Sequence, residues 1–203
     1  ALGGALGSAL LLALAPLFET DGESLTMLSA VLNTNFWLVT HVLCITAGYG
    51  LCIVTALLAH GLLTVAPRRT DNPAGKALLY RLSLISLLLT TVGTLLGGVW
   101  ADQSWGRFWG WDPKENGALL IVLWLLWLQH GRLGGQLSHL AWLSGCAFLT
   151  VIVALAWFGV NLLGIGLHSY GFTTGIAAGL VSFCLAEFLL IAGLWYRGRR
   201  HAA

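Results

Sequence analysis

Long apolar runs are the feature that most limits what this chain can fold into. A helix that crosses a membrane needs about 20 mostly apolar residues. The runs of this kind are residues 36–65, 78–100, 117–129, 139–163 and 175–196, with residues 1–17 as a further candidate. The sequence therefore predicts an all-α, polytopic transmembrane bundle of about six spanning helices, built as a single membrane domain over residues 1–203.

The composition also indicates a lipid environment. Hydrophobic residues make up 58% of the 203 residues and charged residues only 9%, whereas about 25% of the residues in a soluble domain are charged. So few charges cannot cover a surface that faces water. The net charge of +2, without a basic run, gives no support to a nucleic-acid-binding protein.

The cysteines limit the chemistry that the chain itself can perform. Cys44, Cys52, Cys146 and Cys184 lie inside apolar runs and form no CxxC pair, so we expect buried thiols. No CxxCH haem-attachment motif occurs, and the chain is therefore not itself a c-type cytochrome. Because it opens at Ala1 inside an apolar run, we expect that a preceding segment has been removed.

The positions of Lys and Arg predict how the helices are oriented, because cytoplasmic links are enriched in both residues. If the helices alternate, three basic links fall on one side, which is predicted to be the cytoplasm. These links contain Arg68, Arg69 and Lys76, then Arg132, then Arg197, Arg199 and Arg200. The links on the outer side are then residues 18–35, 100–116 and 161–174.

This topology places two histidines at the outer face. His41 lies at the outer end of the run 36–65, and His168 lies in the last outer link. His60 and His130 lie near the inner ends of their helices.

The outer link 100–116 is the most unusual stretch of the sequence, with four of the ten tryptophans, Trp100, Trp105, Trp109 and Trp111. An aromatic belt at the membrane interface would account for one or two of them. It does not account for four interleaved with glycines, which let the backbone approach a flat ligand. Besides the belt, the stretch therefore suggests a platform for a tetrapyrrole, whose propionates Arg107 or Lys114 would bind.

Two carboxylates in this link have a structural explanation. Asp112 at the N-cap, Pro113 at the first helical position and Glu115 at the third form a capping box that opens the helix around residues 117–129. Such a cap would also fix the direction in which the tryptophans are presented.

His41 and His168 are candidate metal ligands. His41 follows Phe36 and Trp37, and His168 is flanked by glycines and aromatic residues. Two outward imidazoles beside a tryptophan-rich surface suggest bis-histidine ligation of a haem iron. A lone exposed histidine is usually only solvated, and the residues alone leave that alternative open.

Four features in a fixed order resemble the CcsA/ResC family, the System II cytochrome c synthases of cytochrome c-type biogenesis. They are the segment WLVTHV with His41, the segment WGRFWGWDPKE that resembles the WWD signature, the segment LQH ending at His130, and the segment GLHSYGF with His168. The likeness covers roughly residues 36–196. After DPKE the family usually has Thr-Trp, whereas this chain has Asn116-Gly117, which is closer to CcmF-type relatives.

The resemblance implies a function. Haem b would be transported to the outer face, presented there, and attached to apocytochrome c through thioether bonds. The chain would be a subunit of a cytochrome c haem lyase that is active with a CcsB/ResB-type membrane partner. The CxxCH segment of the apocytochrome would supply the nucleophiles. The membrane would be the bacterial inner membrane, in preference to a thylakoid membrane.

The resemblance also implies site residues. His41 and His168 would be the axial ligands of an outer haem, and His130 would ligate a second haem within the membrane, for which His60 is a candidate partner ligand. The porphyrin site would be formed by Trp105, Gly106, Arg107, Trp109, Trp111, Asp112 and Lys114.

Three other functions remain open at this point. A haem chaperone of the CcmC type would bind haem without forming thioethers, but the segment HSYGF and the DPKE form of the signature argue against it. A membrane cytochrome b subunit for electron transfer would leave the tryptophan-rich link without a role. A solute transporter would need polar groups at the membrane midplane, and few occur here.

Overall fold

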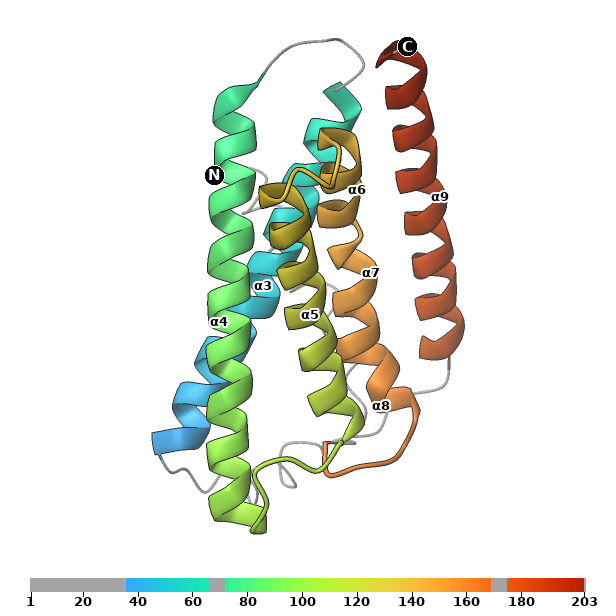
Figure 1. The fold of residues 1–203 in the computed structure, drawn as a ribbon. Coiled ribbons are helices and arrows are strands. Elements are labelled where there is room, and N and C mark those ends of the chain that lie inside the picture. Colours follow the sequence, from blue (N-terminus) through green and yellow to red (C-terminus); the bar gives the residue numbers. More distant parts are fainter. Residues whose placement is uncertain (1–35, 66–71, 169–174, 203) are drawn as a thin grey trace, which may run out of the picture. The chain divides into compact units, whose positions relative to one another are not determined.

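The computed structural model describes residues 36–65, 72–168 and 175–202. These residues belong to one compact unit, Phe36–Ala203, whereas the predicted helix at residues 1–17 belongs to another, Ala1–Asn35, and lies outside the described residues. The described part is helical and contains no strand (Figure 1). This confirms the predicted all-α fold class.

Two long helices, α3 (Phe36–Val65) and α4 (Pro73–Trp105), pack against each other along much of their length. Glycines keep the two backbones close. A Cβ added at Gly93 would lie 2.8 Å from the backbone nitrogen of Ile45, and one at Gly48 would lie 2.7 Å from the Thr90 hydroxyl. Small residues commonly have this role between membrane helices, where lipid competes for apolar contacts and close packing drives association.

Helix α4 extends beyond the predicted apolar run 78–100 at both ends. It begins at Pro73, where the Asn72 side chain caps it by accepting a hydrogen bond from the Gly75 amide. It ends at Gly106, whose left-handed backbone, with φ of 70°, terminates the helix. Because polar residues can continue a helix after it leaves the lipid, the tryptophan-rich loop is reduced from the predicted 100–116 to residues 106–112.

The next two helices run side by side. Helix α5 (Pro113–Leu133) packs on a span that is divided into α6 (His139–Ala147), α7 (Leu149–Ala154), a π-helical turn (Leu155–Gly159) and α8 (Val160–Leu162). The indole of Trp124 donates a hydrogen bond to the Gly145 carbonyl at 2.9 Å. The π-helical turn at Leu155–Gly159 is wider than an α-helical turn, and π-helical turns are frequent at functional sites.

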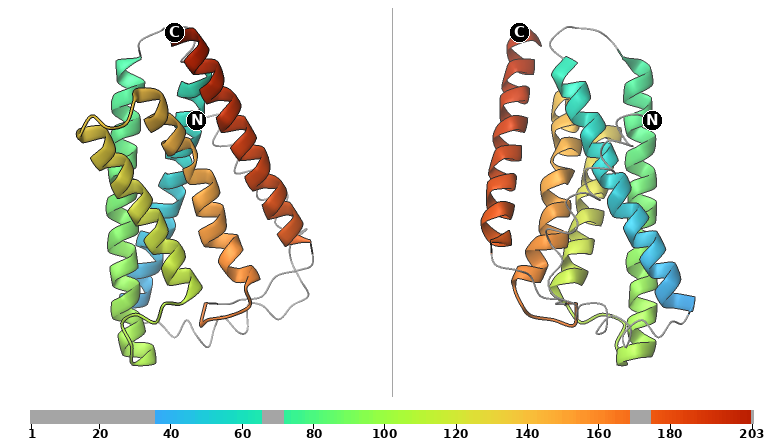
Figure 2. Two further views of the ribbon diagram at one scale, coloured as in Figure 1. Left: turned by 45° about the vertical axis from the view of Figure 1, so that its right-hand side comes forward. Right: turned by 180° about the vertical axis from the view of Figure 1, so that it is seen from behind.

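Helix α9 (Ile176–Ala202) is the least covered of the described helices. Only 6% of the residues in its 18-residue apolar stretch are buried inside the bundle, compared with 56% in the corresponding stretch of the span His139–Leu162. It lies alongside α6 and α7 (Figure 2). At its C-terminal end, Arg197 donates a hydrogen bond to the carbonyl oxygen of Thr64 at 2.8 Å and so ties α9 to the end of α3.

Four of the described helices are long and apolar enough to cross a membrane: Phe36–Val65, Pro73–Trp105, His139–Leu162 and Ile176–Arg200. Helix α5 is not one of them by these criteria, in line with the short apolar run predicted at 117–129. It nevertheless runs between the same two ends of the bundle (Figure 1). The described chain is therefore a polytopic helical bundle.

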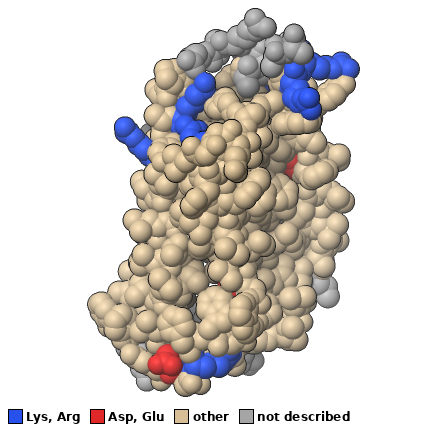
Figure 3. All heavy atoms as spheres, in the orientation of Figure 1, with Lys and Arg blue, Asp and Glu red and all other residues tan. Residues whose placement is uncertain are grey.

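The basic residues gather as the sequence predicted. The last turns of α5 and α9, which contain Arg132 and Arg197, lie at the end of the bundle where α4 begins (Figure 1). Lys and Arg side chains gather at this end in Figure 3. The Arg132 guanidinium lies over the buried Trp142 ring, 3.8 Å from its centroid. Arg68 and Arg69 lie outside the described residues. We call this the basic end, and the end with residues 106–112 the tryptophan end.

Candidate functional site

A cavity of about 340 Å³ opens at the tryptophan end, within the range of about 300–1,000 Å³ that ligand pockets occupy. It lies between the first turns of α3, the last turns of α4, the start of α5 and the π-helical turn. His41 and His168, 127 residues apart in sequence, both line it. Its walls also include Tyr49, Gly97, Gly98, Phe108, Trp109, Lys114, Trp157 and Asn161.

His41 packs against α4, where it makes a hydrogen bond and where Gly97 leaves room for its ring. Its Nδ1 atom lies 2.7 Å from the carbonyl oxygen of Gly93. A carbonyl can only accept, so the proton of the neutral ring is on Nδ1 and Nε2 is left for a ligand. The ring fits because position 97 is glycine: an added Cβ would lie 2.7 Å from the ring carbon Cε1.

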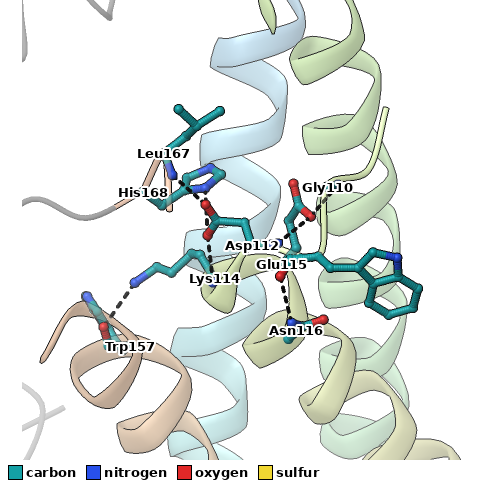
Figure 4. Close-up of polar contacts among 9 residues, drawn as sticks. Gly110, Asp112, Lys114, Glu115, Asn116, Trp157, Leu167 and His168 are labelled. Carbon is teal, nitrogen blue, oxygen red and sulfur yellow. Dashed lines mark hydrogen bonds and ion pairs between the residues drawn. The ribbon is translucent and has the colours of Figure 1, made fainter. Parts of the chain in front are cut away.

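His168 is held by Asp112, which comes from the loop before α5. The Nδ1 atom of His168 lies 3.3 Å from Asp112 Oδ1 (Figure 4). The same carboxylate accepts hydrogen bonds from the backbone amides of Leu167 at 2.6 Å and Lys114 at 2.9 Å. One buried carboxylate thus joins the tryptophan-rich loop, the start of α5 and the link that carries His168.

Gly166 is what allows this link to pass over Asp112. Its φ is +89°, a backbone conformation that L side chains rarely adopt, and an added Cβ would collide with Asp112 Oδ2. Gly166, beside His168, therefore has a structural requirement, which the sequence alone could not separate from ligand access.

The electrostatics favour a neutral His168 and an ionised Asp112. Burial alone would raise the pKa of Asp112, but the amides of Lys114 and Leu167 and the His168 ring outweigh it, so its pKa lies below the ordinary value. Burial lowers the pKa of His168, and Asp112 offsets this only in part. The carboxylate favours a ring proton on Nδ1, which would leave Nε2 free, although the 3.3 Å contact lacks the geometry of a hydrogen bond.

Both cavity histidines therefore share one arrangement. In each, Nδ1 lies close to an acceptor: the His41 atom is hydrogen-bonded to a backbone carbonyl, and the His168 atom lies 3.3 Å from a carboxylate without hydrogen-bond geometry. Metal-ligating histidines almost always have such a partner on the second ring nitrogen, which fixes the tautomer and the ring orientation. Bis-imidazole ligation of a haem iron by this pair stays a prediction.

The predicted capping box is present and also shapes the loop. Asp112 caps α5, and Glu115 Oε2 accepts hydrogen bonds from the amides of Asp112 at 3.1 Å and Gly110 at 2.8 Å. Asn116 donates to the carbonyl of Trp111 at 3.0 Å (Figure 4). The turn before α5 is thus fixed by side chains of its own first helical turn.

The tryptophans of the loop occupy different positions. Trp109 lines the cavity beside Phe108. Trp111 is 70% exposed and contacts the Trp109 ring edge-on, with centroids 6.0 Å apart. Trp111 has a φ of 56°, which is uncommon for a residue other than glycine and indicates local strain of the kind that concentrates at functional sites.

Apart from Lys114, the other predicted porphyrin-site residues lie around the cavity rather than in its wall. Trp105 packs edge-on against Trp100 at 4.6 Å and against the His168 ring at 5.2 Å, so it supports the histidine. Gly106 ends α4, and Arg107 lies against Gly110. Lys114 does line the cavity, and its Nζ donates to the Trp157 carbonyl at 3.0 Å.

Sequence reasoning missed the wall formed by the π-helical turn and the residues after it. Trp157 lines the cavity from that turn, and Asn161 follows in α8. The Asn161 Oδ1 atom is buried and has no hydrogen-bond partner among the described residues. A lone amide in an apolar run was the signal available, but only the fold shows that it faces His41 and His168 across a cavity.

The two inner histidines are not part of this site. His130 is exposed in the last turn of α5, at the basic end, and its Nδ1 lies 2.8 Å from the Leu126 carbonyl. His60 contacts Ala56 and Glu187 instead of His130. Ligation by either residue stays a prediction.

The sequence matches the family model for the cytochrome c assembly protein over residues 5–168. The chain belongs to this family. The match ends at His168, so it includes both cavity histidines, His41 and His168, and the loop 106–112 between them in sequence.

This chain is similar to several curated proteins named "cytochrome c biogenesis protein CcsA". The protein of Chlamydomonas reinhardtii is 38% identical over 146 residues, which are 67% of this chain and 41% of that protein. The proteins of Synechococcus sp. CC9311 and Prochlorococcus marinus MIT 9312 are 43% and 46% identical, over 52% and 47% of this chain and 35% and 31% of their own lengths. The chain thus spans about a third to two fifths of these relatives. The resemblance to CcsA is confirmed.

Proposed function

We propose that this chain presents haem b at the outer face of the membrane for attachment to apocytochrome c, with His41 and His168 as its axial ligands. The observation that carries the proposal is the pair of histidines in one cavity, His41 hydrogen-bonded through Nδ1 to the Gly93 carbonyl and His168 with Nδ1 3.3 Å from the Asp112 carboxylate. Haem is here the substrate that the site holds.

The cavity has the features that a porphyrin site needs. Its walls are mostly apolar, and Trp109, Phe108 and Trp157 offer flat aromatic surfaces. Gly97 and Gly98 let the rings of His41 and Phe108 lie directly against α4, because an added Cβ atom at either position would be 2.7 Å from the neighbouring ring. Lys114 and the unpartnered Asn161 amide supply polar groups, and Lys114 is suited to a propionate.

The attachment reaction needs little chemistry from this chain. In each thioether bond, a thiol of the CxxCH segment adds across a haem vinyl, so that sulfur bonds to one vinyl carbon and hydrogen to the other. The addition is balanced without an oxidant or a leaving group. No cysteine is among the described residues that line the cavity. The chain contributes by orienting the ring, excluding water and holding the iron.

The rest of the proposal concerns the surroundings of this site. The proposed location is a bacterial inner membrane. The enrichment of Arg at the basic end supports an orientation in which this end faces the cytoplasm and the tryptophan end faces the periplasm. A CcsB/ResB-type membrane protein is the proposed partner, and haem lyase activity is proposed for the two together. His130, at the basic end, is the proposed ligand of a second haem on the route from inside.

Reconstitution with the partner and an apocytochrome tests this function. The expected result is haem that stays with the apocytochrome after acid and detergent treatment, which removes only non-covalent haem. Bound haem without covalent transfer would indicate a haem chaperone of the CcmC type. Reduction of the bound haem by a quinol, again without transfer, would indicate a cytochrome b subunit. Either of these two outcomes would contradict the proposal.

A further inference from the structure

The basic end carries most of the positive charge of the described residues. Six of the eight described Lys and Arg residues lie in the first three turns of α4 or the last two turns of α5 and α9, namely Lys76, Arg81, Arg132, Arg197, Arg199 and Arg200. The four described carboxylates lie elsewhere, Asp102, Asp112 and Glu115 at the tryptophan end and Glu187 more than three turns before Arg199 on α9. The link at residues 66–71, outside the described residues, adds Arg68, Arg69 and Asp71 in sequence.

Arg132 is held between two aromatic rings. Its guanidinium lies 3.8 Å from the centroid of the buried Trp142 ring of α6 and 5.1 Å from the centroid of the Tyr80 ring of α4. Such contacts attract the cation to the ring face, but they do not satisfy the five N–H donors of an arginine. Among the described residues, no carboxylate or carbonyl group accepts a hydrogen bond from this guanidinium. Its position is therefore fixed while its donors stay available.

Two arginines near the end of α9 repeat this arrangement. Arg199 lies over Trp195, 4.9 Å from the ring centroid, and Arg200 lies over Tyr196 at 4.6 Å. Each ring is four residues before its arginine, a spacing at which side chains meet on a helix. Both arginines are exposed, and neither forms an ion pair within the described part of the chain. These two cations are thus also placed by rings and not by carboxylates.

The last turn of α9 is in contact with the first turn of α6. A Cβ added at Gly198 would lie 2.8 Å from Cδ1 of Leu140. Leu140 and Trp142 both belong to the start of α6, so the ring that holds Arg132 lies on the helix that the end of α9 packs against. We call Arg132, Arg199 and Arg200, with the rings that hold them, the arginine surface.

The arginine surface lies where lipid headgroups are expected. Its rings are tryptophan and tyrosine, which favour the membrane–water interface. It lies at the ends of two helical spans that are apolar enough to cross a membrane, His139–Leu162 and Ile176–Arg200. Leu133, directly after Arg132, is 70% exposed. A molecule that is anionic at one end and apolar along the rest matches this combination of cations and apolar surface.

We propose that the arginine surface binds the phosphate group of an anionic phospholipid, with Arg132, Arg199 and Arg200 as donors to the headgroup. Guanidinium groups bind phosphate through paired N–H donors, and basic pockets between membrane helices bind anionic headgroups. A soluble phosphate or a nucleic acid would not use the apolar surface beside the cations. The site shares no residue with the haem cavity, so it can be tested without haem.

Native mass spectrometry of the full chain in a neutral detergent, without haem, tests this site. The chain is titrated with phosphatidylglycerol, which is anionic, and with phosphatidylcholine, which is zwitterionic. We expect saturable binding of phosphatidylglycerol that is about tenfold tighter or more than that of phosphatidylcholine. Arg132→Gln should weaken phosphatidylglycerol binding by about fivefold, which corresponds to the loss of one charge near a lipid surface. Equal affinity of the wild type for the two lipids would overturn the proposal.

The matched control is Arg81→Gln, which removes an exposed arginine at the same end. Arg81 is not among the arginines that lie over a ring in the described residues. Its charge acts only through screened attraction, so its loss should weaken binding by less than about twofold. Equal losses from Arg132→Gln and Arg81→Gln would show diffuse attraction and would overturn the assignment to ring-held arginines.

Two further measurements complete the test. Circular dichroism checks that each variant keeps its helices, and the double variant Arg199→Gln/Arg200→Gln, which should also bind phosphatidylglycerol more weakly than Arg81→Gln does, decides the question if Arg132→Gln does not fold. Inorganic phosphate is added in competition with phosphatidylglycerol. We expect no displacement of the lipid, and displacement would indicate a site for free phosphate and contradict the lipid assignment.

Discussion

The Asp112 carboxylate lies 3.3 Å from Nδ1 of His168, and it is also the N-cap of α5. One side chain therefore determines where the helix after the tryptophan-rich loop begins and how a proposed haem ligand is oriented. These two roles can be separated by substitution, because only one of them needs the negative charge.

Asp112→Asn should weaken haem binding while leaving the fold intact. Asn is as good an N-cap as Asp, but its NH2 group cannot accept the hydrogen bond that the Leu167 amide donates to Asp112 Oδ2. Its neutral amide also no longer favours a proton on Nδ1 of His168. Loss of a partner behind a metal-ligating histidine typically costs about 10–100-fold in affinity. Titration of the purified protein with haem would measure this. The exposed Asp102→Asn is the control, and equal affinity in both variants would contradict the positioning role.

Gly97→Ala should disturb the His41 side of the site. The new methyl group would lie 2.7 Å from the His41 ring, which must then move away from its hydrogen bond to Gly93. We expect haem content after purification to fall by about tenfold or more, on the scale of other losses around ligating histidines. The matched control is Gly50→Ala on α3, where nothing lies within 4 Å of the added atom. A normal haem content in Gly97→Ala would show that the ring does not need this space.

Trp109→Phe and Trp111→Phe should differ in their effects. Trp109 lines the cavity, whereas Trp111 is 70% exposed. A porphyrin platform therefore predicts weaker haem binding from Trp109→Phe and little change from Trp111→Phe, with normal membrane insertion of both. Haem titration of both variants in parallel checks this. An aromatic belt predicts no effect from either, and full retention of haem by Trp109→Phe would support the belt.

Haem retention should decrease on acidification. Burial lowers the pKa of His168 despite the neighbouring carboxylate. A depressed histidine pKa means that stability is fully present above the ordinary value of about 6.5 and is lost as the pH falls through the folded value. The pKa of Asp112 is also lowered, so its contribution disappears at still lower pH. Absorption spectra recorded between about pH 7 and pH 4 should show haem release, and unchanged spectra would contradict a neutral His168.

Much of the fold could be predicted from the sequence, because apolar runs long enough to cross a membrane have few alternatives to a helix. The run 36–65 agrees with α3 at both ends, and the capping box at Asp112 fixed the start of α5. The end of α4 was missed because hydropathy reports lipid contact, whereas the helix continues to the glycine at position 106.

The candidate site was predictable only in part. Topology placed His41 and His168 at one face, and the structure places both in one cavity. Their partners were hidden, because the contacts of Gly93 with His41 and of Asp112 with His168 depend on how the helices pack. The contribution of Trp157 depends on a π-helical turn, for which the sequence carries no periodic signal.

The most direct test of the account is the absorption spectrum of haem bound by His41→Ala and His168→Ala, each measured with and without added imidazole. We expect each variant to lose most of its haem and its low-spin spectrum. Imidazole should restore both in part, because it can occupy the position that the missing ring leaves. The wild type should not respond to imidazole. If both single variants retain haem with the low-spin spectrum of the wild type, His41 and His168 are not the axial ligands.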